Sequence, residues 1–294
     1  MTLPTAPNEK RKPMSSAGMS DVTLDSLELS DRYDRISNAQ YKLGLSLIEK
    51  MGAKEGDATL DVGCGTGRLA LSVWEMVSPS GRVVGLDPSP HRVQIANGKL
   101  SGRPNANLEF AVGVGEDLGN LSDDSFDAVY FSSVLHWIND KKKALIEAKR
   151  VLKPGGKIGI TMPSIDVSST FRVMTMEILS RPPYAELIKG KREASMTITS
   201  AELKALLIET GFSDLILEIK EERKFLRSAR GLIMFYEASS FGNFLRFLPE
   251  SLRESLKCDL VRELERKRTA EGIEIISSAV IAIAVKPNIK ILRL

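Results

Sequence analysis

The chain has 294 residues, of which 43% are hydrophobic and 27% are charged. These fractions are typical of a globular protein and exclude a collagen-like, coiled-coil or wholly disordered chain. Lys and Arg (41) exceed Asp and Glu (38) by only three, a surplus too small and too dispersed to predict a nucleic acid partner. Two cysteines and two histidines are too few for a disulfide framework or a structural zinc, so no metal site is expected.

The length suits one main domain with an elaboration. Residues 1–28 are rich in Pro, Ser and charge and lack a sustained apolar period, which predicts a flexible arm before a domain at 29–294. The longest apolar run, 279–285, has seven residues, whereas a membrane-spanning helix takes about 20. No membrane span is therefore expected. The basic N-terminus lacks the apolar stretch of a secretory signal, so the expected location is cytoplasmic.

Helical and strand patterns alternate through the first half of the chain. An apolar stripe with helical spacing runs from Asp31 to Gly52, interrupted at Gln40, and predicts one amphipathic helix that Gly44 weakens. The predicted strands that follow lie at 58–62, 82–86, 108–112, 126–131 and 157–162, the last after a Pro-Gly-Gly turn, with helices ending near 77 and at 91–100 and 140–152 between them. Strands separated by helices of this length predict right-handed crossovers and a parallel sheet.

The rhythm changes after residue 162. Helices are predicted at 168–179 and 200–211, and a charged, edge-like strand at 215–225. A helical insert at about 229–268 separates this strand from a last apolar strand at 275–285. The last two strands therefore form an antiparallel pair with a long excursion between them.

A glycine-rich turn joins the first predicted strand to the helix after it. It reads Leu60-Asp61-Val62-Gly63-Cys64-Gly65-Thr66-Gly67. Such glycines let the backbone approach a ligand closely, beside the exposed N–H groups of a helix N-terminus. The dinucleotide fingerprint GxGxxG is matched imperfectly. If the pattern begins at Gly63, Arg68 stands where its last glycine should be; if it begins at Gly65, it ends at Ala70 and fits the looser form GxGxxA. Asp87, twenty residues after the turn, stands where an acid accepts hydrogen bonds from ribose hydroxyls.

Further motifs follow in order: the stretch 113–127 and the run Leu152-Lys153-Pro154-Gly155-Gly156. With the glycine turn and Asp87, they make residues 30–162 resemble the class I S-adenosylmethionine-dependent methyltransferases. The resemblance implies S-adenosylmethionine as cofactor. It also implies an α/β fold with a Rossmann-like, doubly wound, mostly parallel seven-stranded sheet, an antiparallel last strand and a helical insert as a cap. Residues 29–162 would be the cofactor half and 163–294 the substrate half.

The resemblance also implies roles for matching positions around the glycine turn. The backbone of Gly63, Cys64 and Gly65 would face the methionine part of the cofactor, Asp87 the ribose, and Pro88 one face of the adenine.

Further along the chain, Gly115 would offer its N–H to the adenine ring, and Ser132 its carbonyl to the methionine end. In this family an acid usually accepts a hydrogen bond from the adenine amino group, and Val114 stands in its place here. That hydrogen bond is either lost or supplied by Glu116 or Asp117 nearby. Alternatively, Glu116 and Asp117 are ordinary solvated acids of the loop.

Candidate substrate residues lie at the carboxyl edge of the sheet, where open α/β folds place ligands. His136 has an unperturbed pKa suited to accepting a proton, and packing with helix capping is its alternative role. Trp137 beside it is either a pocket wall or a core residue. In similar methyltransferases the N-terminal helix closes over the site, so Tyr33 would touch the methionine carboxylate and Tyr41 the substrate, unless both only pack the helix.

The insert is dense in aromatic residues, among them Phe235 and Tyr236. These side chains form either a lid over a hydrophobic acceptor or the core of the cap itself. We expect a methyltransferase acting on a small, partly apolar acceptor by O-methylation, of a carboxylate among others, or by C-methylation. The chain resembles ubiquinone and menaquinone C-methyltransferases as well as juvenile hormone acid and trans-aconitate carboxyl methyltransferases. The alternatives are a catalytically silent, cofactor- or partner-binding member of the fold and, less favoured, an NAD-dependent oxidoreductase.

Overall fold

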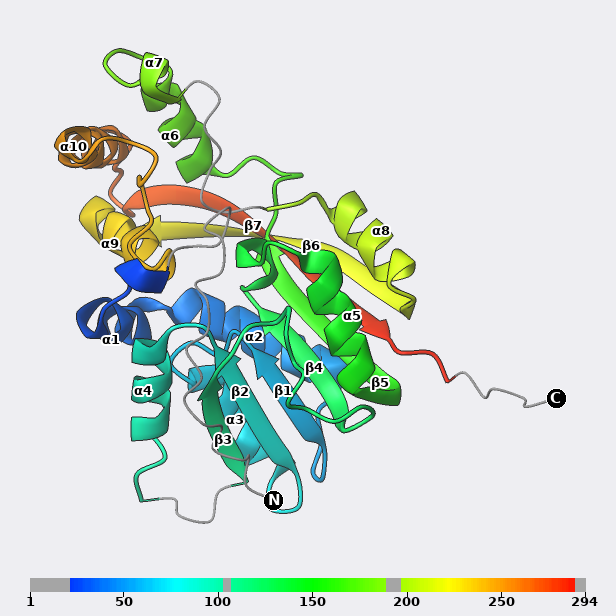
Figure 1. Cartoon of the computed structure of the whole chain (residues 1–294). Coiled ribbons are helices and arrows are strands. Elements are labelled where there is room, and N and C mark those ends of the chain that lie inside the picture. The colour runs from blue at the N-terminus through cyan, green and yellow to red at the C-terminus, as the bar shows by residue number, and fades with distance from the viewer. Residues whose placement is uncertain (1–21, 103–106, 189–196, 289–294) are drawn as a thin grey trace.

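A computed structural model of the chain describes residues 22–102, 107–188 and 197–288 (Figure 1). The helical elements are η1 (Val22–Leu24), α1 (Leu27–Ile36), α2 (Asn38–Met51), α3 (Arg68–Val77), α4 (Pro90–Gly98), η2 (Leu135–Trp137), α5 (Lys141–Val151), α6 (Thr170–Leu179), α7 (Ala185–Ile188), α8 (Ser200–Glu209), α9 (Ala229–Ser239) and α10 (Glu250–Arg266). The strands are β1 (Ala58–Val62), β2 (Arg82–Asp87), β3 (Leu108–Val112), β4 (Phe126–Ser132), β5 (Leu152–Pro163), β6 (Ser213–Leu226) and β7 (Ile273–Val285).

The strands form one seven-stranded sheet in the order β3-β2-β1-β4-β5-β7-β6. Neighbouring strands pair in parallel from β3 to β5, whereas β7 is antiparallel to both β5 and β6. This confirms the predicted doubly wound, mostly parallel sheet with an antiparallel last strand.

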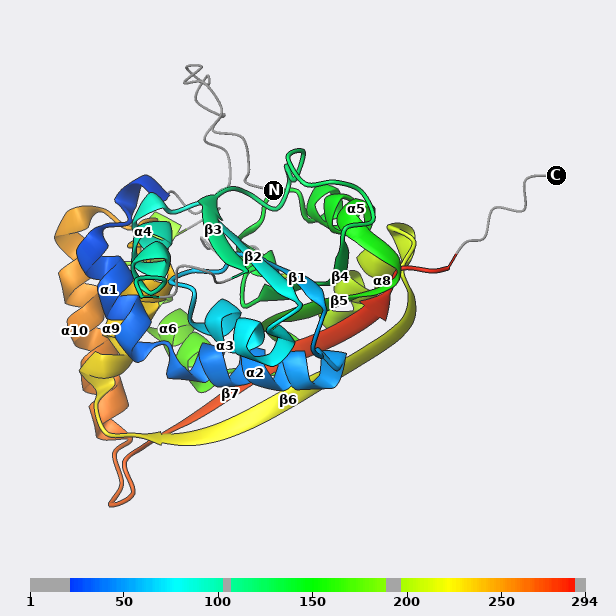
Figure 2. The same ribbon diagram turned by 90° about the horizontal axis from the view of Figure 1, so that it is seen from below.

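Helices cover both faces of the sheet. Helices α5 and α8 share one apolar core with one face, and α2, α3 and α4 share a second core with the other (Figure 2). The interior strand β1 is buried along its whole length, as expected for a parallel strand between two helical layers. The carboxyl ends of β1, β2 and β4 consequently meet at one edge.

The flexible arm predicted at 1–28 is wrong for its last seven residues, and residues 1–21 lie outside the described part. Residues 22–28 contain η1 and the start of α1, and the Ser26 hydroxyl caps that helix by accepting from the N–H of Leu29. The Asp25 side chain is fully buried against Arg92, 67 positions along the chain. This long-range ion pair has no counterpart in local composition, so composition alone predicts an arm where the chain is ordered.

The single helix predicted up to Gly52 is two helices, α1 and α2, separated at Ser37. Ser37 and Asn38 are poor in helix interiors because their side chains compete for backbone hydrogen bonds. The Arg68 side chain supplies hydrogen bonds at this break, since it donates to the Asp34 carbonyl and to Asn38 Oδ1, both at 2.8 Å. The predicted end at Gly52 is confirmed, since Gly52 caps α2 in the left-handed conformation.

Strand β5 begins earlier than predicted. The Pro-Gly-Gly run lies within β5 instead of preceding it, and the pairing of β4 with β5 shifts register between Phe126 and Ala128. Gly155 has a φ of +80°, so the turn expected there exists as an irregularity inside the strand.

The cap is built on a projecting hairpin. The pairing of β7 with β5 begins at Ala279, opposite Pro163. The first part of β7, residues 273–278, extends beyond β5 and pairs with β6. Helices α6, α9 and α10 pack on this projection and form a third apolar cluster with fully buried Leu256, Leu260 and Leu264. The predicted helical insert is thus confirmed and has its own core.

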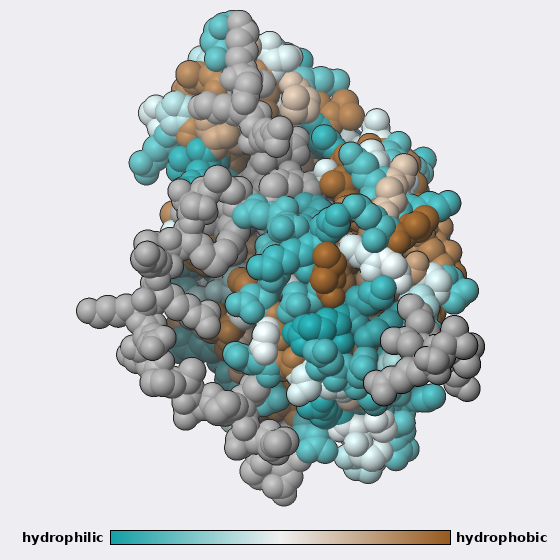
Figure 3. All heavy atoms as spheres, turned by 45° about the vertical axis from the view of Figure 1, so that its right-hand side comes forward, coloured by the Kyte–Doolittle hydropathy of each residue, from teal (hydrophilic) through white to brown (hydrophobic). Residues whose placement is uncertain are grey.

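Most of the described side chains visible in Figure 3 are hydrophilic, and hydrophobic ones occur there in small separated groups. Among the described residues, no helix combines the length and apolar character needed to cross a membrane.

We expect Leu260→Ala to lower the free energy of unfolding by about 2–5 kcal/mol, because the substitution leaves a cavity in the core of the cap. Urea titration followed by circular dichroism measures the change. Ile208→Ala, at a side chain that is 58% exposed on α8, serves as control and should change the free energy by no more than about 0.5 kcal/mol. Equal losses in both variants would show that the cap core contributes no more than the surface.

Candidate active site

A cavity of about 1050 Å³ lies between the carboxyl edge of the sheet and the cap. Ligand pockets usually measure about 300–1,000 Å³, so this cavity is large enough for a cofactor and a second molecule. The structure brings every predicted site residue to its lining: Tyr33, Tyr41, Gly63, Cys64, Gly65, Asp87, Pro88, Gly115, Glu116, Ser132, His136, Trp137, Phe235 and Tyr236. Their individual roles remain predictions.

The glycine loop after β1 requires glycine. Gly63 has a φ of +79°, and a Cβ atom there would lie 2.3 Å from Cγ2 of Val134. The N–H groups of Gly63 and Cys64 both donate to the Leu86 carbonyl, at 2.6 and 2.9 Å, which ties the loop to the end of β2. Gly65 has a φ of +55°, and a Cβ atom there would have Cε1 of Tyr33 as its nearest neighbour, at 3.5 Å. The loop backbone therefore faces the cavity beneath the Tyr33 ring.

Asp87 ends β2 and is 2% exposed. Its Oδ2 accepts from the N–H of Gly65 and its Oδ1 from the N–H of Ser89, both at 2.9 Å. Burial raises the pKa of this carboxyl, and the charge of Arg92 opposes the rise. Because each carboxylate oxygen accepts more than one hydrogen bond, Asp87 keeps the capacity to bind two hydroxyls.

Asp61 is a site residue that the sequence prediction missed. It is 1% exposed at the end of β1, lines the cavity, and neither of its oxygens has a hydrogen-bond partner among the described residues. Burial raises its pKa well above the usual range, and the charge of Asp87 adds to the rise. The Tyr130 hydroxyl lowers that pKa somewhat without a hydrogen bond of standard geometry. A buried, unpaired carboxylate of this kind favours a bound cation.

Two acids are candidates for the adenine side, and the structure brings only one of them to the cavity. Glu116 lines the cavity beside Val114, whereas Asp117 does not and accepts instead from the N–H of Gly119 at 3.2 Å. Gly115 is buried, and a Cβ atom there would lie 3.0 Å from Cδ1 of Ile138.

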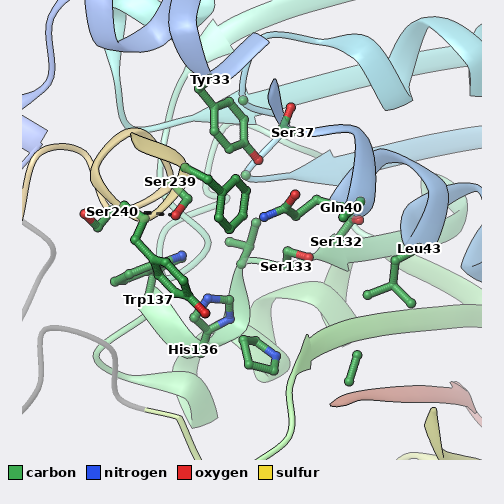
Figure 4. A pocket seen from close by; sticks show the side chains of 18 of the residues that line it. Tyr33, Ser37, Gln40, Leu43, Ser132, Ser133, His136, Trp137, Ser239 and Ser240 are labelled. Carbon is green, nitrogen blue, oxygen red and sulfur yellow. Dashed lines mark hydrogen bonds between the residues drawn. The ribbon is translucent and has the colours of Figure 1, made fainter. Parts of the chain in front are cut away.

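The end of β4 lies close to α2. A Cβ atom at Gly44 would lie 2.7 Å from Oγ of Ser132 and 2.6 Å from Cδ2 of Leu69, so the glycine that weakens the helix allows its close approach. Gln40, which interrupts the apolar stripe of α2, lines the cavity near Ser132 (Figure 4), and its Oε1 atom has no partner among the described residues. The interruption in the stripe is the sequence signal that marks this residue.

His136 lies in η2, is 4% exposed, and its Nδ1 atom has no hydrogen-bond partner among the described residues. Burial lowers its pKa to about 3, and the nearby charge of Lys141 contributes. His136 is therefore a neutral imidazole at neutral pH. The ring of Trp137 lies 4.9 Å from that of His136, and both side chains face the cavity (Figure 4).

The two tyrosines of the N-terminal helices differ. The Tyr33 ring points into the cavity (Figure 4), and burial raises the pKa of its hydroxyl. The Tyr41 hydroxyl instead forms a hydrogen bond of 2.8 Å with Ser72, and the Arg68 guanidinium lies 4.7 Å from its ring. Tyr41 is thus held against α3 at the margin of the cavity, which supports the packing alternative for that residue.

Aromatic side chains of the cap form the opposite wall. The rings of Phe171 and Tyr236 stack 4.1 Å apart, and Phe244 continues the stack at 5.6 Å from Tyr236. Phe235 meets Tyr236 edge-on at 5.5 Å. All four rings line the cavity, and Phe171, Tyr236 and Phe244 also belong to the apolar cluster of the cap, so for these three the predicted lid and the predicted core of the cap are the same side chains. No cluster of three or more metal-ligating side chains is found in the described ranges.

Comparisons with known proteins agree with this geometry. A family model described as "Methyltransferase domain" matches residues 60–160. Demethylmenaquinone methyltransferase of Staphylococcus aureus (strain JH9) is 31% identical over 202 residues, which cover 63% of this chain and 81% of the relative. The protein of the same name from Lactobacillus johnsonii is 28% identical over 204 residues, 64% of this chain and 83% of the relative.

Solved structures share the fold. The YcgJ protein of Bacillus subtilis has a TM-score of 0.59 and 18% identity, covering 85% of this chain and 99% of its own. Phosphoethanolamine N-methyltransferase 2 of Haemonchus contortus, solved with S-adenosyl-L-methionine, has a TM-score of 0.55 and 21% identity, covering 84% of this chain and 52% of its own.

The chain belongs to the class I S-adenosylmethionine-dependent methyltransferases, and S-adenosylmethionine is its cofactor. The residues fit this group. Asp61 offers an unpaired buried carboxylate to a cofactor that carries positive charge, and Asp87 offers free lone pairs to hydroxyls. The open backbone at Gly65 leaves room for the ligand beside both acids.

We expect Asp61→Asn to stabilise the free protein and to weaken cofactor binding. Because the pKa of Asp61 in the fold lies well above the ordinary value of roughly 3.9, its ionisation destabilises the fold as the pH rises through the raised pKa. The amide removes this loss, so the gain in unfolding temperature should be larger at pH 8 than at pH 4. Titration calorimetry with S-adenosylmethionine should show binding weakened at least about tenfold, since hydrogen bonds to charged groups contribute roughly 1.5–3 kcal/mol.

Asp87→Asn is the matched control. The pKa of Asp87 is also raised, but both of its oxygens accept from backbone N–H groups and an amide loses one of these hydrogen bonds. Asp87→Asn should therefore weaken cofactor binding without a net stabilisation of the free protein. Unchanged cofactor affinity in a folded Asp61→Asn variant would contradict the role given to Asp61.

Proposed function

We propose that this enzyme transfers the methyl group to a small, partly apolar acceptor, at oxygen, a carboxylate included, or at carbon. One observation carries the proposal: a single cavity joins the two buried acids of the sheet to the aromatic wall of the cap. A deep cavity with an aromatic wall suits an apolar molecule of limited size.

When bound, S-adenosylmethionine supplies a methyl group already activated by its sulfonium charge. What this chain adds is alignment, a proximity effect worth up to roughly 7–11 kcal/mol. The aromatic cap side chains hold the apolar body of the acceptor, while Tyr33 and the glycine loop face each other across the other part of the cavity. Because the walls belong to both the sheet and the cap, the acceptor is held between them and away from water.

His136 is proposed to act on the nucleophile. Its unpartnered Nδ1 atom in the cavity is placed to accept a hydrogen bond from a hydroxyl or an acidic carbon. A pKa of about 3 makes the protonated ring unfavourable, so the ring orients the nucleophile and holds its proton only transiently during methyl transfer, after which the proton passes to water. Gln40 Oε1, also unpartnered among the described residues, is proposed as a second acceptor of hydrogen bonds beside it.

The relatives support a small acceptor. They are named demethylmenaquinone methyltransferases, which favours the quinone C-methylation branch as the first chemistry to test. Membership of the methyltransferase family removes the support for an NAD-dependent oxidoreductase. A catalytically silent member remains distinguishable by the test below.

A methyl-transfer screen with labelled S-adenosylmethionine tests this function. Phenols, quinols, apolar carboxylic acids and, for comparison, tRNA and DNA oligomers are offered as acceptors. We expect label in small apolar compounds, and we expect Phe235→Ala to raise the KM for the acceptor several-fold with cofactor affinity kept. Phe225→Ala, on β6 outside the cavity lining, is the matched control. Label only in nucleic acid would overturn the acceptor class, and cofactor binding without any transfer would support a silent member.

For His136 we expect turnover to be independent of its titration between about pH 5 and pH 8, because its pKa of about 3 keeps it neutral over this range. His136→Ala should lower kcat by about 10²–10⁴ if the ring accepts the proton, with cofactor affinity unchanged. Steady-state rates over this pH range measure both effects. A loss within a few-fold would leave packing as the role of His136.

A further inference from the structure

Arg92 lies at the centre of a buried cluster that the reaction itself does not use. Its side chain is 4% exposed, and its Nε atom donates to Oδ2 of Asp25 at 3.1 Å. The same Oδ2 atom accepts from the hydroxyls of Ser30, at 3.1 Å, and Ser89, at 2.7 Å. Two charges removed from water are retained only with such complete pairing, so the cluster is a defined structural element.

Arg92 connects three separate parts of the chain. It belongs to α4 of the cofactor half, its partner Asp25 belongs to the segment before α1, and its Nη2 atom donates to the carbonyl of Ala238, near the end of α9, at 2.8 Å. The N-terminal segment and the cap are the two covers of the cavity. One guanidinium therefore joins both covers to the sheet.

The same guanidinium lies between two rings of the cavity wall. Its Cζ atom is 4.4 Å from the centre of the Tyr33 ring and 3.8 Å from that of Phe241. Both rings line the cavity, one from α1 and one from the loop after α9. A flat cation stacks on two aromatic faces at once, which an ammonium group cannot reproduce.

The loop after α9 is held in an unfavourable conformation beside Arg92. Phe241 and Leu245 have φ values of +54° and +65°, a region that costs energy for side chains other than glycine. Between them, a Cβ atom at Gly242 would lie 3.2 Å from the Leu24 carbonyl oxygen. The loop thus packs directly on the N-terminal segment, and its strained backbone persists because its surroundings fix it.

The cluster reaches the cofactor site through Ser89. The Ser89 hydroxyl donates to Asp25, while its N–H donates to Asp87 Oδ1 at 2.9 Å. Asp87 in turn accepts from the N–H of Gly65. A continuous series of hydrogen bonds therefore runs from the cap, through Arg92 and Asp25, to the acid expected to bind the ribose.

We infer that Arg92 is a positioning residue that holds the N-terminal segment and the cap closed together over the cofactor. Each turnover needs demethylated cofactor to leave and fresh cofactor to enter, and steps of this kind commonly limit kcat. Exchange requires both covers to lose their shared contact at Arg92. This inference concerns cofactor exchange and is independent of which acceptor is methylated.

The test measures the dissociation rate of S-adenosylhomocysteine, followed by stopped-flow displacement using the fluorescence of Trp137 in the cavity wall, with Trp74→Phe in every protein compared so that Trp137 is the one tryptophan present. Arg92→Lys keeps a positive charge for Asp25 but loses the flat surface between the two rings. We expect it to raise the dissociation rate at least tenfold. Arg150→Lys is the matched control, because Arg150 ties α5 to the carbonyls of Leu118 and Leu121 away from the cavity, and its dissociation rate should stay within twofold of wild type.

The double variant Asp25→Asn/Arg92→Met removes both charges and keeps the test valid if Arg92→Lys does not fold. Hydrogen exchange gives a second readout: residues 22–36 and 238–245 should lose protection together in the variants. Dissociation rates within twofold of wild type in every folded variant would overturn the inference. Loss of protection in only one of the two segments would also overturn it, since a shared contact must release both.

Discussion

Two buried carboxylates at the ends of neighbouring parallel strands impose the main constraint on this structure. Asp61 and Asp87 both face one cavity, and burial raises the pKa of each. Two backbone N–H groups and the nearby charge of Arg92 stabilise the Asp87 carboxylate. Asp61 has no hydrogen-bond partner among the described residues. The free protein is thus less stable than its core would allow, and a cationic ligand recovers that stability.

What the sequence predicted well was local. The glycine turn and Asp87 lie within 25 positions of one another and share one βαβ unit, so spacing alone placed them. The break at Ser37 combines a local preference of Ser37 and Asn38 with hydrogen bonds from the distant Arg68, and the order of residues 22–28 depends on Arg92. The partners of these contacts lie 34 and 67 positions apart along the chain, so a pattern of neighbouring residues cannot predict them. The sequence shows Asp61 as an acid inside an apolar strand. Only the structure shows that its carboxyl group is buried without a hydrogen-bond partner among the described residues, which is what marks it as a candidate site residue.

The cavity lies where separate hydrophobic cores meet. The cofactor half rests on the two cores that sandwich the sheet, while the cap has a third, built on the projecting part of β6 and β7. The aromatic wall belongs to this third core, so Phe171 and Tyr236 both stabilise the cap and shape the chamber. Packing and recognition are carried by the same rings. This explains why aromatic density in the insert predicted the wall but not which atom of an acceptor it would present.

The projecting hairpin has a mechanical consequence. Residues 273–278 of β7 continue past the end of β5 as a pair with β6, which at roughly 3.3 Å per residue is a two-stranded ribbon about 20 Å long. Isolated ribbons twist more, and more variably, than strands inside a wide sheet. A change of a few degrees in twist at the root of this cantilever displaces the helices at its free end far more than it displaces the sheet. The cap is therefore held at two places, the root of this ribbon and the hydrogen bond from Arg92 to the Ala238 carbonyl, and the twist of the ribbon acts on the part of the cap that lies away from Arg92.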